Sequence, residues 1–160
     1  MLPAIAQAHP GHDAGASFAT GALHPLGGID HLLALIAVGL LSARMGGRAL
    51  FAIPAAFLSL LGAGIALGYA GLQLDFVEPA IAASIVVCAV LALLPPRQLP
   101  VATAALAAWF AIFHGNAHGI EFAAGVGRAN YAAGLLFTST FVIGLTAWAA
   151  TKSAPWATSA

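Results

Sequence analysis

Residues 49–71 read ALFAIPAAFLSLLGAGIALGYAG, an apolar run that contains no charged side chain. An α-helix rises 1.5 Å per residue, so about 20 such residues are enough to cross the hydrocarbon core of a bilayer. The run is apolar on every side and therefore lacks the polar face that a surface helix of a soluble protein presents to water. It predicts a transmembrane helix.

Four further apolar stretches flank this run, and the fold expected from them is all-α. The predicted spans are roughly Ser17 to Ser42, Ala49 to Gly71, Val77 to Leu94, Gln98 to Ile120 and Ala129 to Thr151. A transmembrane barrel would instead show alternating segments of about ten residues. The sequence therefore predicts a polytopic transmembrane helix bundle of about five spans.

The composition agrees with a membrane protein and excludes several other classes. Only 6% of the 160 residues are charged, against about 25% in soluble domains. Acids balance Lys plus Arg at five each, so no basic patch suggests a nucleic-acid partner. Cys88 is the only cysteine, which excludes a disulfide framework, an Fe–S cluster and a Cys-rich zinc site. The expected partner is the lipid bilayer, and the oligomeric state, a homo-oligomer included, stays open.

The positive charges predict the orientation of the bundle. Arg44 and Arg48 follow the first span, Arg97 follows the third and Lys152 follows the fifth. Arg128 is the only basic residue in the loops on the opposite side. Cytoplasmic loops of membrane proteins are enriched in Lys and Arg. We therefore expect the N-terminus outside and the C-terminus in the cytoplasm.

The first residues resemble the end of a signal peptide. Ala6-Gln7-Ala8 has the small-residue form of a signal-peptidase site, so residues 1–8 are expected to be a signal-peptide or cloning remnant and residues 9–160 a single transmembrane transporter domain. Cleavage would leave His9 as the first residue, whose amine and imidazole could chelate a metal together with His12. The alternative is a short disordered tail.

Two clusters of ionisable residues interrupt the apolar stretches. Residues 114–121 read HGNAHGIE and residues 24–31 read HPLGGIDH. Ionisable side chains at membrane depth are costly and mark functional sites. The alternative for any one histidine is a hydrogen bond between helices, but several clustered ligands favour a site for a metal ion.

The spacing places three ligands of the fourth span on one face of a helix. His114, His118 and Glu121 are offset by four and seven residues, so they fall within roughly 60° of one another. Asn116 points away from this face. Gly115 and Gly119 form a pair of small residues that would let a neighbouring helix approach closely.

The first cluster allows three geometries. On a continuous helix, His24 and His31 share a face and Asp30 is turned about 120° away, where it contacts another helix or orients an imidazole from behind. Pro25 disfavours helical backbone at His24, so His24 could instead cap a helix that begins at Pro25, or the span could break near Gly27-Gly28. Irregular backbone is tolerated at this depth where it lines a cavity.

The first and fourth spans are antiparallel in this topology. If they are neighbours, His24 lies level with Glu121, and His31 lies about 10 Å deeper, level with His114. The sequence therefore predicts a ladder of ligands in the outer half of the membrane, with His31 and His114 in one metal site.

The ligand types narrow the choice of ion. Imidazole suits nickel, cobalt, zinc and copper, whereas calcium and magnesium prefer oxygen ligands. Met1, Met45 and Cys88 are scattered, which argues against a Cu(I) route. Nickel, cobalt and zinc remain.

The two motifs, His24-Pro25-x-x-Gly-x-Asp30-His31 and Phe113-His114-Gly115-x-Ala117-His118-Gly119-x-Glu121, resemble those of the HupE/UreJ family of nickel and cobalt permeases. The resemblance covers about residues 9–150. It implies uptake of nickel or cobalt across a bacterial inner membrane by a multi-pass protein, with the ion as cargo and no resident cofactor. The metal ligands that it implies are His24, Asp30, His31, His114, His118 and Glu121. Family members commonly have a complete leader and a sixth span, and this chain departs from that pattern at both ends.

Two functions other than transport could use the same histidines. An intramembrane metal-dependent hydrolase could use these histidines, but the H-E-x-x-H and G-x-S-x-G patterns are absent, so we do not expect an enzyme. A membrane metal chaperone or sensor would use the same ligands without moving the ion, and the sequence leaves this alternative open.

Overall fold

The computed structural model describes residues 16–93, 100–122 and 126–153, and in these ranges α-helix is the only regular secondary structure, as predicted. Residues 1–15, with His9, His12 and the cleavage site after Ala8, lie outside the described residues. So does Arg97. The helices are α1 (Phe18–Gly27), α2 (Ile29–Met45), α3 (Ala49–Tyr69), α4 (Val77–Leu93), α5 (Pro100–Glu121) and α6 (Arg128–Ser153).

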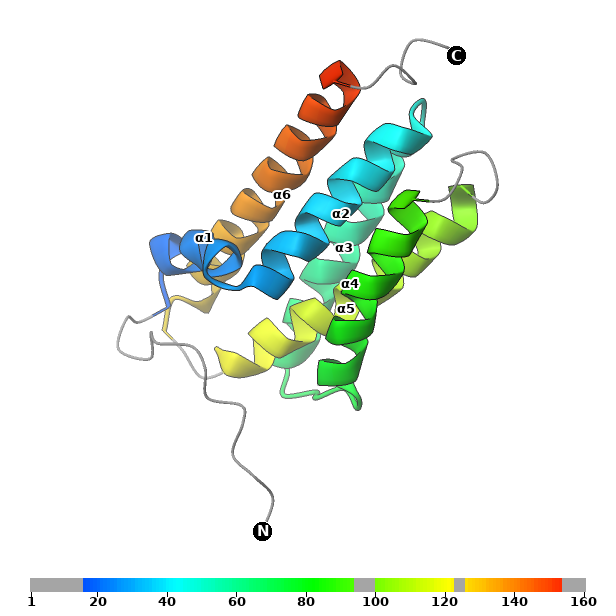
Figure 1. Cartoon of the computed structure of the whole chain (residues 1–160). Coiled ribbons are helices and arrows are strands. Elements are labelled where there is room, and N and C mark those ends of the chain that lie inside the picture. Colours follow the sequence, from blue (N-terminus) through cyan, green and yellow to red (C-terminus); the bar gives the residue numbers. More distant parts are fainter. Residues whose placement is uncertain (1–15, 94–99, 123–125, 154–160) are drawn as a thin grey trace.

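The longer helices form an up-and-down bundle, with α1 lying across one end (Figure 1). α2, α4 and α6 run in one direction, and α3 and α5 run antiparallel to them. The most extensive packing is between α3 and α5, while α1 and α2 both pack against α6, and α2 also contacts α4. This arrangement places α1, the start of α2 and the second half of α5 around one region of the bundle.

The charged helix ends are distributed unevenly. Arg44 is in the last turn of α2, Arg48 is the N-cap of α3 and Lys152 is in the last turn of α6, and these three helix ends lie at the same end of the bundle, the upper end in Figure 1. Arg128 begins α6 at the opposite end. The orientation of the bundle in the membrane stays a prediction that rests on this asymmetry.

Within the described residues, two helices are long and apolar enough to cross a membrane by themselves, namely α3 and α6. The bent pair of α1 and α2 is a third candidate if the two are counted as one span. α4 is apolar over Val77–Leu91 but shorter, and α5 carries the polar side chains of the second motif. The membrane character of the bundle is therefore clear, whereas the number of about five spans stays a prediction.

The first predicted span is not one helix but two, joined at an angle of 84°. Gly28 ends α1 and begins α2 with extended backbone, at φ −107° and ψ 119°. α1 begins at Phe18, where the side chains of Ser17 and Thr20 form a capping box. His24 therefore lies inside α1, so the expectation that it caps a helix starting at Pro25 is wrong. The break near Gly27-Gly28 is the one of the three allowed geometries that the structure shows.

The packing of α3 against α5 depends on glycines. A Cβ atom built on Gly68 would lie 2.6 Å from the Cα of Gly119, and one built on Gly119 would lie 2.8 Å from the Cα of Gly68. Real Cβ atoms do not approach this closely, so only glycine fits. Gly64 and Gly115 meet the opposite backbone in the same way. Small residues on both sides thus bring the two backbones together.

Asn116 holds α5 against the connection between α3 and α4. Its side chain is completely buried; Nδ2 donates to the carbonyl of Leu72 (2.7 Å), and Oδ1 accepts from the backbone N–H of Leu74 (2.9 Å). The amide thereby pairs two backbone groups of the connection between α3 and α4. With the glycines, this contact sets the rotation of α5 and turns its histidines away from that connection.

Candidate metal centre

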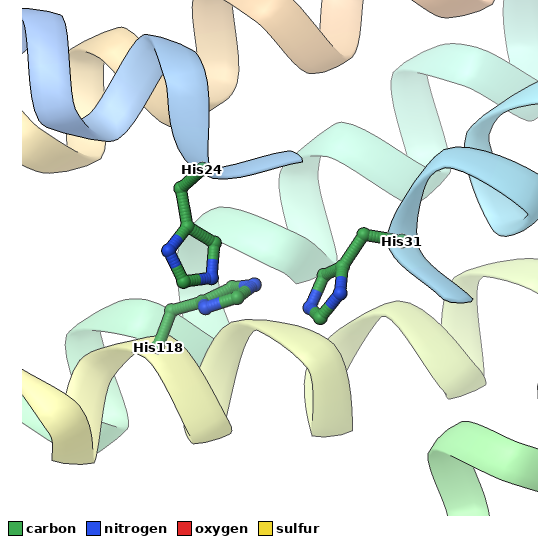
Figure 2. A group of neighbouring side chains, drawn as sticks. All are labelled: His24, His31 and His118. Carbon is green, nitrogen blue, oxygen red and sulfur yellow. The ribbon is translucent and has the colours of Figure 1, made fainter. Parts of the chain in front are cut away.

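Three histidines from three helices converge at the bend between α1 and α2. Each of His24 in α1, His31 in α2 and His118 in α5 offers a ring nitrogen, and these three atoms all lie within 4.8 Å of one another. Figure 2 shows the three imidazoles facing a common space. We refer to His24, His31 and His118 as the histidine trio.

The trio is nearly tight enough to share one ion. The ring centroids of His24 and His118 are 4.5 Å apart, and those of His31 and His118 are 4.7 Å apart. Metal–nitrogen bonds of about 2.0–2.1 Å require the nitrogens around one ion to be roughly 3.0–3.4 Å apart. The three nitrogens would therefore have to move closer together around a bound ion.

The bend at Gly28 makes this convergence possible, and it corrects the predicted ladder. On a straight helix, residues seven apart are separated by about 10 Å along the axis, so His24 was expected far above His31. The 84° bend instead brings their ring centroids to 5.6 Å. Gly28 also lies close to the ligands, because a Cβ there would lie 2.8 Å from both Asp30 Oδ1 and His31 Nδ1 and would force one of these side chains to move.

Asp30 orients His31. The Nδ1–H group of His31 donates to Oδ1 of Asp30 over 3.0 Å, which leaves the lone pair of the ring on Nε2. Nε2 is buried and, within the described part of the chain, makes no hydrogen bond. A carboxylate behind a histidine is the arrangement that orients metal-ligating imidazoles and increases their basicity. The geometry therefore supports a role for Asp30 in orienting an imidazole, rather than in contacting another helix.

His114 lies behind the trio, one helical turn before His118. Its side chain is buried, and its ring centroid is 5.5 Å from that of His31. His31 and His114 are thus neighbours, as the antiparallel arrangement of their helices predicted. His114 does not belong to the group whose ligand atoms lie within 4.8 Å of one another.

Ser84 of α4 is a partner of His114 that the sequence analysis missed. The Ser84 hydroxyl donates to the carbonyl of Ile81 (2.6 Å), so its oxygen accepts from Nε2–H of His114 (2.9 Å). The side chain is buried. A single hydroxyl within the apolar run of α4 was the available signal, but its partner could be identified only from the packing of α4 against α5.

Glu121 is not brought to the trio. It is the last residue of α5 and is exposed. Of the six ligands that the resemblance implied, three form the trio, Asp30 supports it, His114 lies behind it and Glu121 lies outside it.

Tyr131 closes the trio on the side of α6. Its ring is buried and packs edge-on against His24, with centroids 5.8 Å apart, while Phe122 covers its other side at 3.9 Å. Tyr131 is not among the candidate site residues that the sequence analysis identified. Its contact with His24 could not be read from spacing, because it depends on how α1 crosses α6.

A small cavity lies next to the trio. Its volume is about 10 Å³, roughly the space that one water molecule needs. His31, His114 and His118 line one part of it, and the rest is formed mainly by apolar side chains. These are Pro25, Ala34, Leu35, Phe57, Leu61 and Leu135, with Ser139 as the additional polar group. Leu35, Phe57, Leu61 and Leu135 are also buried members of the hydrophobic core, so the site is closed toward the interior of the bundle.

Comparisons with known proteins agree with the motifs. A family model described as HupE / UreJ protein matches residues 1–160. The curated Protein HupE of Rhizobium leguminosarum bv. viciae is 38% identical over 136 residues, which cover 84% of this chain and 70% of the relative. No solved structure matches the chain.

Proposed function

The chain belongs to the HupE/UreJ family, and we propose that it takes up nickel or cobalt across the bacterial inner membrane by way of the histidine trio. The observation that supports this most directly is the convergence of His24, His31 and His118, whose ligand atoms lie within 4.8 Å of one another. We expect the protein to carry the ion as cargo and to catalyse no reaction.

The chemistry of the trio fits a borderline divalent ion. Neutral imidazole nitrogens bind nickel, cobalt and zinc well, whereas magnesium and calcium prefer oxygen ligands. Three protein ligands leave further coordination positions for water or for ligand exchange. Such an open shell suits an ion that must leave again, whereas a structural site is usually closed by four protein ligands.

Asp30 contributes charge as well as orientation. A dication that enters a low-dielectric region loses hydration, which costs several kcal/mol even after relaxation. Imidazoles are neutral when they bind metal, so they do not cancel this charge. The carboxylate of Asp30 touches His31 directly and is therefore the acid placed to compensate the ion at the trio.

The position of the trio suits the outer mouth of an importer. The trio lies where α1 meets α2, at the end of the bundle opposite the helix ends with Arg44, Arg48 and Lys152. In the orientation proposed here, that end faces the extracytoplasmic side. An ion would reach the trio from outside before it entered the bundle.

A membrane metal chaperone or sensor is the second candidate. The observation in its favour is that most of the cavity wall is apolar, formed by Leu35, Phe57, Leu61 and Leu135, so few ligands lie beyond the trio in this conformation. Such a protein would bind metal at the trio without transporting it.

Metal uptake by proteoliposomes distinguishes these two functions. The full chain is reconstituted with an internal nickel-sensitive dye, and external Ni²⁺ or Co²⁺ is added. The proposal expects time-dependent accumulation that His31→Ala abolishes. Ser42→Ala serves as the control, because Ser42 is a buried serine of α2 whose hydroxyl donates to the Val38 carbonyl and does not contact the trio. Equilibrium binding without accumulation would support the chaperone or sensor instead.

A further inference from the structure

We propose that the bundle holds a second ion station, formed by His31, His118 and His114, to which the ion passes from the histidine trio by exchanging His24 for His114. The inference rests on the proposed function, since it concerns the route of the same ion. It assigns His114 and Ser84 to the step after capture.

The small cavity provides the location. It is lined by His31, His118 and His114, two members of the trio and the histidine behind them. His24 is not among its lining residues in the described part of the chain. The space is therefore bounded by a second set of three imidazoles, which is more widely spaced than the trio. Its volume of about 10 Å³ suits one ion or one water molecule.

His31 is placed to stay bound during the exchange. Its ring centroid lies 4.7 Å from that of His118 and 5.5 Å from that of His114. Asp30 occupies Nδ1, so the buried Nε2 is the ligand atom for both stations. The ion can thus shift toward His114 without releasing His31.

Ser84 prepares His114 to accept the ion. The Ser84 hydroxyl uses its hydrogen on the Ile81 carbonyl and accepts from Nε2–H of His114. This tautomer leaves the lone pair of His114 on Nδ1. Ser84 is therefore a positioning residue for the second station, comparable to the partners that orient other metal-binding histidines.

Exchange of a single ligand keeps the energetic cost of movement low. A bare dication in the bundle would lose most of its hydration at once, whereas an ion held throughout by His31 and His118 loses one imidazole and gains another. Conduction requires sites that bind well enough to capture the ion but weakly enough to release it. Ser139, which lines the same cavity from α6, is a further polar group beside this route.

Cobalt binding to single and double variants tests the two stations separately. The full chain in nanodiscs is titrated with Co²⁺, whose visible absorption bands report the number and type of ligands. We expect His24→Ala to bind Co²⁺ about tenfold more weakly and with an altered spectrum, because the second station remains. His114→Ala should change affinity less than threefold, yet lower Co²⁺ uptake by proteoliposomes on the order of tenfold or more. The double variant His24→Ala/His114→Ala should lose the cobalt bands.

Several results would overturn the second station. Complete loss of the cobalt bands in His24→Ala would show that no second set of ligands exists. Wild-type uptake by a folded His114→Ala would remove His114 from the route, and loss of binding by His114→Ala as severe as its loss of uptake would show a single site. If wild-type protein neither binds nor accumulates cobalt, the proposed function itself fails, which is a different outcome.

Ser84→Ala keeps the test decisive if His114→Ala does not fold. Its matched control is Ser42→Ala, since Ser42 is also buried and also donates to a carbonyl of its own helix, that of Val38. We expect Ser84→Ala to lower cobalt uptake about tenfold and, in the His24→Ala background, to shift the cobalt bands of the remaining station. Equal uptake and unchanged bands in the Ser84 and Ser42 variants would contradict the positioning role.

Discussion

Asp30 Oδ1 lies 3.0 Å from His31 Nδ1, directly after the 84° bend that joins α1 to α2. This one contact connects the irregular backbone to the metal centre, because it fixes the tautomer of the histidine that the two proposed stations share. It also places a negative charge next to neutral ligands.

Asp30→Asn should therefore impair uptake strongly. The amide keeps the shape of the carboxylate but removes the charge, and loss of such a partner typically weakens metal affinity or activity about 10- to 100-fold. Glu121→Gln, at the exposed end of α5, should have a smaller effect because water can replace its charge. Initial uptake rates at matched expression compare the two, and an Asp30→Asn protein as active as wild type would remove Asp30 from the ion route.

Gly28→Ala should damage the metal centre although it adds only a methyl group. The new Cβ would lie 2.8 Å from both Asp30 Oδ1 and His31 Nδ1, so at least one side chain of the hydrogen-bonded pair would have to move. We expect weaker Co²⁺ binding, by about tenfold or more, measured by titration. Gly27→Ala is the matched control, since a Cβ at Gly27 has no neighbour within 4 Å. Equal affinities for the two variants would show that the pair does not depend on this close approach.

Gly119→Ala should destabilise the bundle. Its Cβ would collide with the backbone of α3 around Ile65 and Gly68, and overpacking of this kind costs typically about 1–3 kcal/mol. Gly62 lies on α3, the helix opposite Gly119, and a Cβ built on it has no neighbour within 4 Å. Gly62→Ala should therefore be neutral or slightly stabilising. Thermal unfolding in detergent measures both. A Gly119→Ala protein as stable as the Gly62→Ala protein would contradict the close packing of α3 against α5.

Metal affinity should fall as the medium becomes acidic. Each imidazole must be unprotonated to bind, so protons compete with the ion. The pKa of free histidine is about 6.5. The apparent Co²⁺ affinity should therefore weaken as the pH falls through that region and become constant above it. Titrations in buffers that do not bind cobalt provide the test, and an affinity that is constant from mildly acidic to neutral pH would count against histidine ligation.

Much of the fold could be predicted because apolar runs and their flanking residues determine it locally. The run Ala49 to Gly71 became α3, Ala49–Tyr69, and the run Ala129 to Thr151 became α6, Arg128–Ser153. Each run is longer than a bilayer requires and contains no internal charge, so the boundaries follow from composition. The first span was different, since the sequence around Gly27-Gly28 allowed a continuous helix or a break.

The arrangement of the site could be predicted only in part. Spacing alone put His114, His118 and Glu121 on one face of α5, but not the rotation of α5 about its own axis. That rotation depends on the glycine contacts with α3 and on Asn116. The convergence of His24 with His118 depends on the bend and on the crossing of α1 over α6. Tertiary packing, rather than residue type, therefore decided which of the candidate ligands meet.

The location of a bound ion tests the central claim most directly. Crystals of the full chain grown with Co²⁺ would be measured at the cobalt absorption edge, where an anomalous difference map locates the metal independently of the protein. We expect a peak between His24, His31 and His118, about 2.0–2.2 Å from their ring nitrogens. A cobalt peak only at Glu121 or elsewhere on the surface, with the trio empty at saturating metal, would contradict the assignment of these histidines as the metal centre.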